Sequence, residues 1–307
     1  MVIKPITHRL VYLAVRLVLC LIQALPLESG YALARLIGLL GYHFNKRHRH
    51  VAEDNLRRAF PGRYSQAELD AIVRSVYVHF ASIIIEIAHI QRRLRDTTWH
   101  QHMRLRNTEP IVRLMLGGRP VILMTAHFGN WEMAGYAMAV FGLKPYSVAR
   151  ALDNPHLERL IRMFRTRTGQ EIIYKRGAFD QVSAVLQRGG LVGFLSDQDA
   201  GQRGVFVEYF GRPASSHKGV ALLSLEHDAP VCVGFARRLG RGFQYEVSLE
   251  EVIDPRDYRG LANPVWSITQ QCAWAVERAV RQAPEQYLWL HRRWKHQPEA
   301  KEEARAA

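Results

Sequence analysis

The strongest constraint on the fold of this chain is a regular alternation of strand and helix patterns that begins at Pro120. Short apolar runs at 120–126, 146–149, 172–174 and 191–195 are separated by stretches with helical periodicity and helix-capping residues. Such alternation predicts an α/β fold in which helices flank a largely parallel sheet. In sheets of this kind, functional groups gather beyond the carboxyl ends of the strands.

Polar side chains follow four of these predicted strands. In chain order they are His127, Arg150, Lys175 and Asp197. Because packing alone does not require a polar residue at each strand end, we expect a functional site along this edge of the sheet. An ion pair between Arg150 and Asp197 is the alternative explanation for two of them.

The segment Thr125–Glu132 comes directly after the apolar run Val121–Met124 and includes the end of the first predicted strand. Gly129 and Asn130 can form a turn there, so that His127 ends the strand and Glu132 lies on the first turn of a helix. A neutral histidine beside a carboxylate is suited to take a proton from a hydroxyl group, because the usual histidine pKa of about 6.5 lies near working pH. The alternative is a core histidine followed by a helix-capping glutamate.

The N-terminal region indicates membrane attachment. Residues 10–27 are almost all apolar, which is just long enough to cross a hydrocarbon core of about 30 Å, although Arg16 opposes insertion. The pattern predicts either a tilted span or a helix in the membrane plane. A second apolar patch at 31–44 ends on the basic cluster 46–50, which anionic headgroups would attract. A cleaved secretory signal peptide is disfavoured, because the segment is not followed by a small-residue cleavage site.

One long helix is predicted from Ser65, where Ser65 and Glu68 form a capping box and no Gly or Pro follows before Pro110. Its apolar residues recur at three- and four-residue steps, as expected of a scaffold helix. We therefore expect four regions along the chain. They are membrane-anchoring helices at 1–50, a helical scaffold at 51–115, the α/β domain with the site at 116–297, and a flexible tail at 298–307.

The charge balance favours anionic partners. The chain has 42 Lys and Arg against 28 Asp and Glu, a formal net charge of +14, which suits acidic lipid headgroups, an acidic carrier protein or nucleic acid. The basic residues are spread over several segments without a nucleic-acid-binding motif. The three cysteines are scattered, and no HExxH is present, so neither a disulfide framework nor a zinc site is predicted.

His127 and Glu132, with four residues between them, match the HX4E motif of the bacterial lipid A biosynthesis late acyltransferases, the Kdo-lipid A lauroyl and myristoyl transferases. Nearly the whole chain resembles this family, which belongs to the lysophospholipid acyltransferase superfamily. The other similar segments are 55–61, 197–199 with 205–207, and 283–295. The mycobacterial mannoside acyltransferases are also similar, so the resemblance leaves the acceptor open.

The resemblance implies transfer of a fatty acyl chain from acyl carrier protein to a hydroxyl group of a membrane glycolipid, such as a lipid A precursor, at the cytoplasmic face of the inner membrane. His127 would be the general base, and Glu132 would orient its ring and stabilise the imidazolium. No metal or bound cofactor is implied, because the acyl carrier protein thioester is a co-substrate. The expected partners are acyl carrier protein, anionic membrane lipids and a phosphorylated glycolipid acceptor, and not nucleic acid.

Several residues are candidates for substrate contact. Arg150 is always charged and can bind two phosphate oxygens at once. Asp197 and Asp199 resemble the acidic motif of the family. Asn130 lies in the turn, and Lys218 precedes a helix whose first N–H groups could receive a phosphate.

Three alternatives stay open. The same His/Glu pair could serve a hydrolase that acts on a lipid ester or thioester. The acceptor could be another glycolipid or a lysophospholipid. A non-catalytic basic membrane protein is the third alternative, and it predicts that His127 is dispensable.

Overall fold

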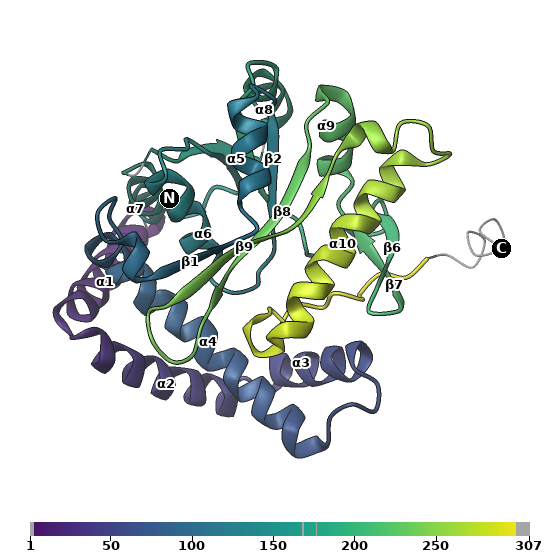
Figure 1. The fold of residues 1–307 in the computed structure, drawn as a ribbon. Coiled ribbons are helices and arrows are strands. Elements are labelled where there is room, and N and C mark those ends of the chain that lie inside the picture. Colours follow the sequence, from purple (N-terminus) through teal and green to yellow (C-terminus); the bar gives the residue numbers. More distant parts are fainter. Residues whose placement is uncertain (1–2, 168, 176, 299–307) are drawn as a thin grey trace.

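The computed structural model describes residues 3–167, 169–175 and 177–298, so the expected tail at 298–307 falls almost entirely outside the described residues. Within this part of the chain, seven strands form one sheet in the order β1-β9-β8-β2-β5-β3-β4, and helices pack on both faces (Figure 1). Neighbouring strands are parallel except for the antiparallel pair β8 and β9. The predicted α/β fold with a largely parallel sheet is confirmed.

The strands of this sheet are four to nine residues long. They are β1 (Met103–Arg106), β2 (Val121–Thr125), β3 (Tyr146–Ala149), β4 (Glu171–Tyr174), β5 (Leu191–Leu195), β8 (Val231–Arg238) and β9 (Tyr245–Ile253). A separate antiparallel hairpin joins β6 (Val205–Tyr209) to β7 (Arg212–Ser216).

The helices fall into an N-terminal group and a group interleaved with the strands. The first group is α1 (Ile3–Ala24), α2 (Leu27–Phe44), α3 (Lys46–Ala59) and α4 (Gln66–Arg93). The second group is α5 (Glu109–Leu116), α6 (Trp131–Val140), α7 (Pro155–Thr166), α8 (Ala178–Gln187), α9 (Gly219–His227) and α10 (Pro264–Gln282). The short 3-10 turns are η1 (Trp99–Gln101), η2 (Pro255–Asp257) and η3 (Pro284–Gln286).

The period-two pattern of the central strands explains why both faces of the sheet are covered. In β2, Ile122 and Met124 belong to the core that includes α8, α9 and α10, whereas Val121 and Leu123 pack with Ile111 of α5 on the other face. A strand that is apolar on both faces needs helices on both sides. This arrangement leaves only the strand ends for polar chemistry.

The long helix predicted from Ser65 is confirmed at its start and wrong at its end. Ser65 accepts from the backbone N–H of Glu68, whose carboxylate accepts from the backbone N–H of Ser65, so the capping box is complete. The helix ends at Arg93, because the Thr98 hydroxyl donates to the Arg93 carbonyl and starts a turn. Strand β1 follows and pairs with β9, so the stretch 51–115 is not helical throughout.

In the part of the chain that the structure describes, two helices are long and apolar enough to cross a membrane by length and composition. Pro5–Ala24 in α1 is only 6% buried, whereas Gln66–Arg93, which is α4, is 50% buried. Partial burial identifies α4 as a core helix that packs against α2. The exposed apolar helix α1 is consistent with the predicted membrane attachment.

Candidate active site

The carboxyl ends of β2 and β5 place a histidine and an aspartate side by side. Thr125 and Leu195 are the last residues of these strands and lie opposite each other; His127 and Asp197 each follow two residues later. The His127 Nδ1 lies 2.7 Å from Asp197 Oδ1, and the His127 backbone N–H donates to Asp197 Oδ2 at 3.0 Å. A single carboxylate therefore orients both the ring and the backbone of His127.

The Asp197 carboxylate is held in its charged form. Burial raises its pKa, but the charge of His127 and the hydrogen bonds from the His127 ring and backbone together lower that pKa below its usual value. A charged carboxylate can only accept, so the His127 Nδ1 carries the donated proton and Nε2 is left as the basic nitrogen. This is the protonation state that a general base needs.

The structure corrects the expected role of Glu132. This carboxylate was expected to orient the His127 ring, but it accepts a hydrogen bond from Arg165 Nε of α7 at 3.0 Å. The hydrogen bond to the ring nitrogen Nδ1 is made by Asp197 instead. The reason is topological, because β2 and β5 are neighbours in the sheet although 70 residues separate His127 from Asp197. Glu132 still lines the same cavity as His127.

The turn after His127 depends on a glycine. Gly129 has φ +60°, and a Cβ there would lie 2.2 Å from the Ala236 carbonyl oxygen, so only glycine fits. The following Asn130 is fully buried, caps α6 by accepting from Met133 N–H, and donates to Glu86 Oε2 at 2.8 Å. Asn130 is therefore a structural cap, and the prediction that it contacts substrate is wrong because its side chain is enclosed.

A large cavity opens beside the His127 ring. It has a volume of about 640 Å³, and the polar and aromatic side chains that line it include His127, Trp131 and Arg165. The Trp131 ring lies 5.1 Å from the His127 ring, between centroids. Apolar residues line much of the remaining wall: Leu123, Met124, Met138, Phe179, Val182, Leu223 and Leu249. This volume lies within the range of about 300–1,000 Å³ that is typical of ligand sites.

Exposed cations lie near the cavity at the ends of β3 and β4. Arg150 and Lys175 both line the cavity, and the Arg150 side chain is 81% exposed with Asp153 3.6 Å away. Arg150 therefore does not form the ion pair with Asp197 that was the alternative explanation. Lys218 is exposed at the start of α9, between His217 and Gly219, which line the cavity.

Comparison with known proteins identifies the family. Residues 4–296 match the family described as bacterial lipid A biosynthesis acyltransferase. This chain belongs to that family. It is 27% identical to the lipid A biosynthesis lauroyltransferase of Escherichia coli (strain K12) over 292 residues, which cover 92% of this chain and 90% of the relative.

Two further relatives show how wide the similarity is. The lipid A biosynthesis palmitoleoyltransferase of Escherichia coli (strain K12) is 26% identical over 290 residues, covering 92% of this chain and 90% of that protein. The phosphatidylinositol mannoside acyltransferase of Mycobacterium tuberculosis (strain H37Rv) is 27% identical over 137 residues, 43% of each chain. The full-length matches are thus to lipid A biosynthesis enzymes.

In this lipid A acyltransferase family member, a C-terminal segment at 286–291 fastens the turn that carries His127. Gly129 N–H donates to the Gln286 carbonyl and Leu288 N–H donates to the His127 carbonyl, each at 3.0 Å. The Gln286 side chain accepts from Arg238 N–H at 2.9 Å and donates to the Arg238 carbonyl at 3.0 Å. The segment lies within the stretch 283–295 that resembles the family, and we name it the strap.

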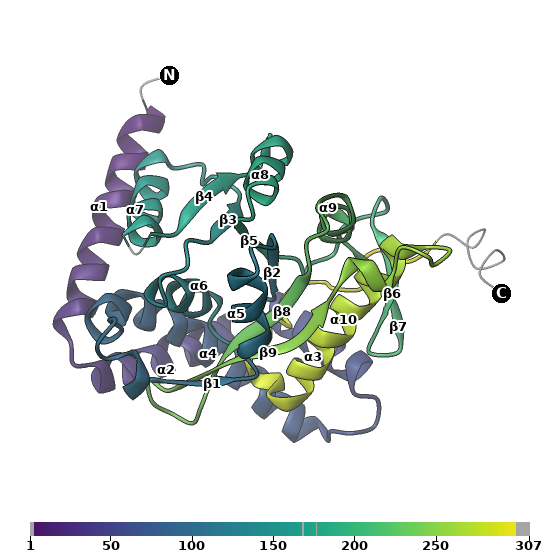
Figure 2. The same ribbon diagram turned by 45° about the horizontal axis from the view of Figure 1, so that its top comes forward.

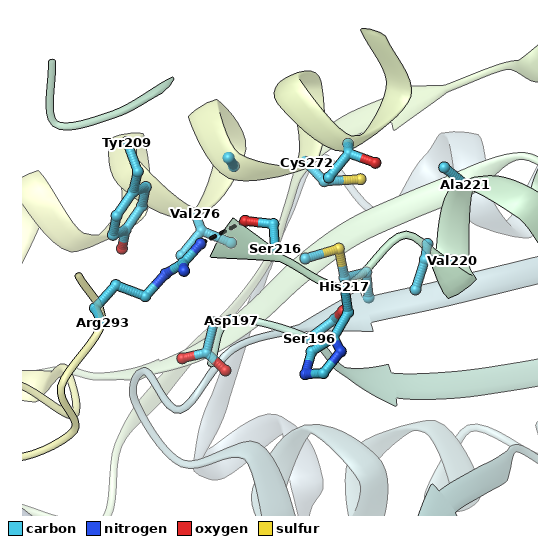
Figure 3. Close-up of a pocket in the computed structure, with 13 residues that line it drawn as sticks. Ser196, Asp197, Tyr209, Ser216, His217, Val220, Ala221, Cys272, Val276 and Arg293 are labelled. Carbon is cyan, nitrogen blue, oxygen red and sulfur yellow. Dashed lines mark hydrogen bonds between the residues drawn. The ribbon is translucent and has the colours of Figure 1, made fainter. Parts of the chain in front are cut away.

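A buried arginine lies behind Asp197. Arg293 donates from Nη2 to the Ser216 hydroxyl at 2.5 Å, and its guanidinium lies 5.2 Å from the Tyr209 ring centroid. Figure 3 shows Arg293, Ser216 and Asp197 around one small pocket. Ser215 and Ser216 belong to β7, so they do not cap the helix that follows them.

Asp199 holds the C-terminal region and does not face the large cavity. Its carboxylate lies 2.6 Å from His296 Nδ1, and its backbone N–H donates to His291 Nε2 at 3.0 Å. Sequence reasoning missed the roles of Arg165, Arg293 and the strap. The only available signal was that 283–295 resembles the family. Among the described residues, no group of three or more His, Cys, Asp or Glu side chains could hold a metal ion.

Proposed function

We propose that this protein transfers a fatty acyl chain from an acyl carrier protein thioester to a hydroxyl group of a lipid A precursor at the cytoplasmic face of the inner membrane. The observation that carries the proposal is the His127–Asp197 pair at the wall of a large, mainly apolar cavity, in a chain that matches the lipid A biosynthesis acyltransferase family over residues 4–296. The acyl carrier protein is the proposed partner, and its acidic surface suits a chain of net charge +14.

The proposed chemistry uses His127 as the general base. Nε2 takes the proton of the acceptor hydroxyl as its oxygen attacks the thioester carbonyl, and the tetrahedral intermediate then expels the carrier thiolate, which receives the proton from the imidazolium. The Asp197 carboxylate stabilises that imidazolium through Nδ1. No protein nucleophile or metal is needed in this scheme.

The cavity offers separate places for the two ends of the reaction. The apolar wall suits an acyl chain, because chain burial removes apolar surface from water. The exposed cations Arg150 and Lys175 suit the phosphate groups of a lipid A precursor, and Lys218 lies close enough in sequence to the lining residues to join them. Glu132 and Arg165, which form an ion pair with each other, also line the cavity.

The test is an in vitro transfer reaction. Purified protein in detergent or vesicles is incubated with acyl carrier protein thioesters and a panel of lipid A precursors, mannosides and lysophospholipids, and the products are identified by mass spectrometry. We expect acylated lipid A precursor with the wild-type protein, and a rate about a hundred- to ten-thousandfold lower with His127→Ala. Free fatty acid as the main product, or undiminished transfer by His127→Ala, would contradict the proposal.

A further inference from the structure

Helix α1 contacts the rest of the molecule along a single stripe that runs its length. The stripe consists of the partly or fully buried residues His8, Tyr12, Val15, Leu19 and Ile22, at alternating steps of four and three residues, and Gln23 beside Ile22 is partly buried as well. That spacing describes one face of a helix. Since α1 rises about 1.5 Å per residue, the contact extends over about 21 Å.

Both ends of this contact are fastened by specific interactions. Near the N-terminus, Asn154 Nδ2 donates to the His8 carbonyl at 2.9 Å, and the Tyr12 ring lies 5.7 Å from the His156 ring at the start of α7. Near the other end, Gln23 Nε2 donates to the Ala88 carbonyl of α4 at 3.1 Å. Figure 2 shows α1 lying beside α7 and continuing down to the α2 and α4 layer.

The opposite face of α1 is an exposed apolar stripe. Its members are Ile6, Leu10, Leu13, Leu17 and Leu21, which are 55%, 61%, 59%, 62% and 60% exposed. At 3.6 residues per turn this stripe lies about half a turn from the buried one. Two exposed arginines, Arg9 and Arg16, lie about a quarter turn from its centre.

We propose that α1 lies in the plane of an anionic membrane surface and does not span the bilayer. The exposed stripe Ile6–Leu21 enters the headgroup and acyl boundary, and Arg9 and Arg16 lie at the level of the headgroup phosphates. An anionic membrane is favoured over a neutral one because the positive charges of Arg9 and Arg16 are complementary to anionic headgroups.

A spanning α1 is inconsistent with its fastening to α7. Helix α7 packs beside the N-terminal half of α1 and exposes Arg159 and Arg162 to solvent. A spanning α1 would carry these arginines into the hydrocarbon region, where charged side chains are strongly unfavourable. An α1 in the membrane plane leaves α7 in water. Because Arg165 of α7 lines the cavity, this orientation also holds the cavity close to the lipid surface. The inference rests on helix packing and exposure, and it does not depend on the proposed reaction.

The first test measures depth in the membrane with spin labels. Cys20→Ser removes the exposed native thiol, since Cys232 and Cys272 are buried, and Ile6→Cys, Leu13→Cys or Leu21→Cys then carries the label. The full-length protein is reconstituted on vesicles of phosphatidylcholine and phosphatidylglycerol. We expect similar depths for the three labels and a water-exposed label at the control Gly260→Cys, which lies in the loop before α10. A spanning helix would separate residues 6 and 21 by about 22 Å of depth. That gradient, or three labels in water, would overturn the proposal.

The second test removes the proposed headgroup contacts. Arg9→Gln with Arg16→Gln should weaken binding to the same anionic vesicles about 25-fold, at about fivefold for each arginine. Binding to pure phosphatidylcholine vesicles should hardly change. The matched control Arg104→Gln with Arg241→Gln alters exposed arginines outside α1 and should leave both affinities unchanged. An equal loss on both kinds of vesicle would overturn the placement of Arg9 and Arg16 at anionic headgroups.

Discussion

The ends of β2 and β5 differ from the ends of β3 and β4, although all four strands belong to one run of parallel neighbours. At the central pair, the His127 and Asp197 side chains are 19% and 3% exposed and bind each other. At the outer pair, Arg150 is 81% exposed and Lys175 is also exposed. The sequence alone showed only that a polar residue follows each of the four strands, and not which of them are buried.

The difference separates two tasks. Proton transfer needs atoms held within hydrogen-bond distance, which the buried centre provides through the strap, Gly129 and Asp197. Attraction of an anionic lipid needs only positive charge near the cavity. Arg150 and Lys175 provide this charge at the ends of β3 and β4 while their side chains remain hydrated. We therefore expect substitutions at the centre to lower kcat and substitutions at the edge to raise KM.

The largest expected effect is at Asp197. Asp197→Asn should lower kcat about a hundred- to ten-thousandfold, because the imidazolium loses its counter-charge. The acid limb of the pH–rate profile should move to lower pH for the same reason. Steady-state transfer assays across pH measure both.

Glu132→Gln is the matched comparison, since Glu132 lines the same cavity but binds Arg165 and not the ring. It should lower transfer without moving the pH profile. If Glu132→Gln moved the profile and Asp197→Asn did not, the assignment of the ring partner would be reversed.

The next effect concerns the strap. Gln286→Ala leaves the backbone N–H and carbonyl of Arg238 without partners, which should lower the free energy of unfolding by roughly 3 kcal/mol. Denaturant unfolding measures this loss. Gln282→Ala, at the exposed end of α10, is the control and should change stability by less than about 0.5 kcal/mol. Equal stability of both variants would show that the strap does not hold the turn.

A pH effect follows from His79, which lies behind the same turn with Nε2 3.0 Å from the Gly129 carbonyl. Burial, together with the charge of Arg238, lowers the pKa of His79 to about 3. Because the unfolded histidine titrates near pH 6.5, the unfolded state binds more protons between these values. The contribution of neutral His79 to the free energy of unfolding is fully present above pH 6.5. It falls with acidification, by about 2 kcal/mol at pH 5.

Unfolding free energies at pH 7 and pH 5 measure this loss. His79→Gln, whose amide can still donate to the carbonyl, should remove most of the slope. If the pH dependence of the unfolding free energy were unchanged in His79→Gln, it would come from other histidines. Candidates are His102 and His291, because burial also lowers their pKa values.

The smallest effect is expected at Arg150, which follows the end of β3. Arg150→Gln should raise the KM for a phosphorylated acceptor about fivefold and leave kcat unchanged, because the contact is exposed and screened by salt. Arg104→Gln, on β1 at the opposite edge of the sheet, is the control and should change neither parameter. A loss of kcat in Arg150→Gln would show that the edge takes part in the chemistry.

Much of the architecture could be predicted from local patterns. Strand and helix periodicity located β2, β3, β5 and α6, and the capping box at Ser65 located the start of α4. These signals are local, since they depend on side chains within one or two turns of the chain. The end of α4 was wrong because β1 exists only through its pairing with β9, far away in the chain.

The sequence by itself determined which residues are available for chemistry: His127 and Asp197 at strand ends, and basic residues around them. Only the tertiary structure decided that Asp197, and not Glu132, binds the ring, and that Asn130 and Asp199 are enclosed supports. The physical reason is that strand order is set by long-range packing. A hydrogen bond between residues 70 positions apart leaves no local pattern in the chain.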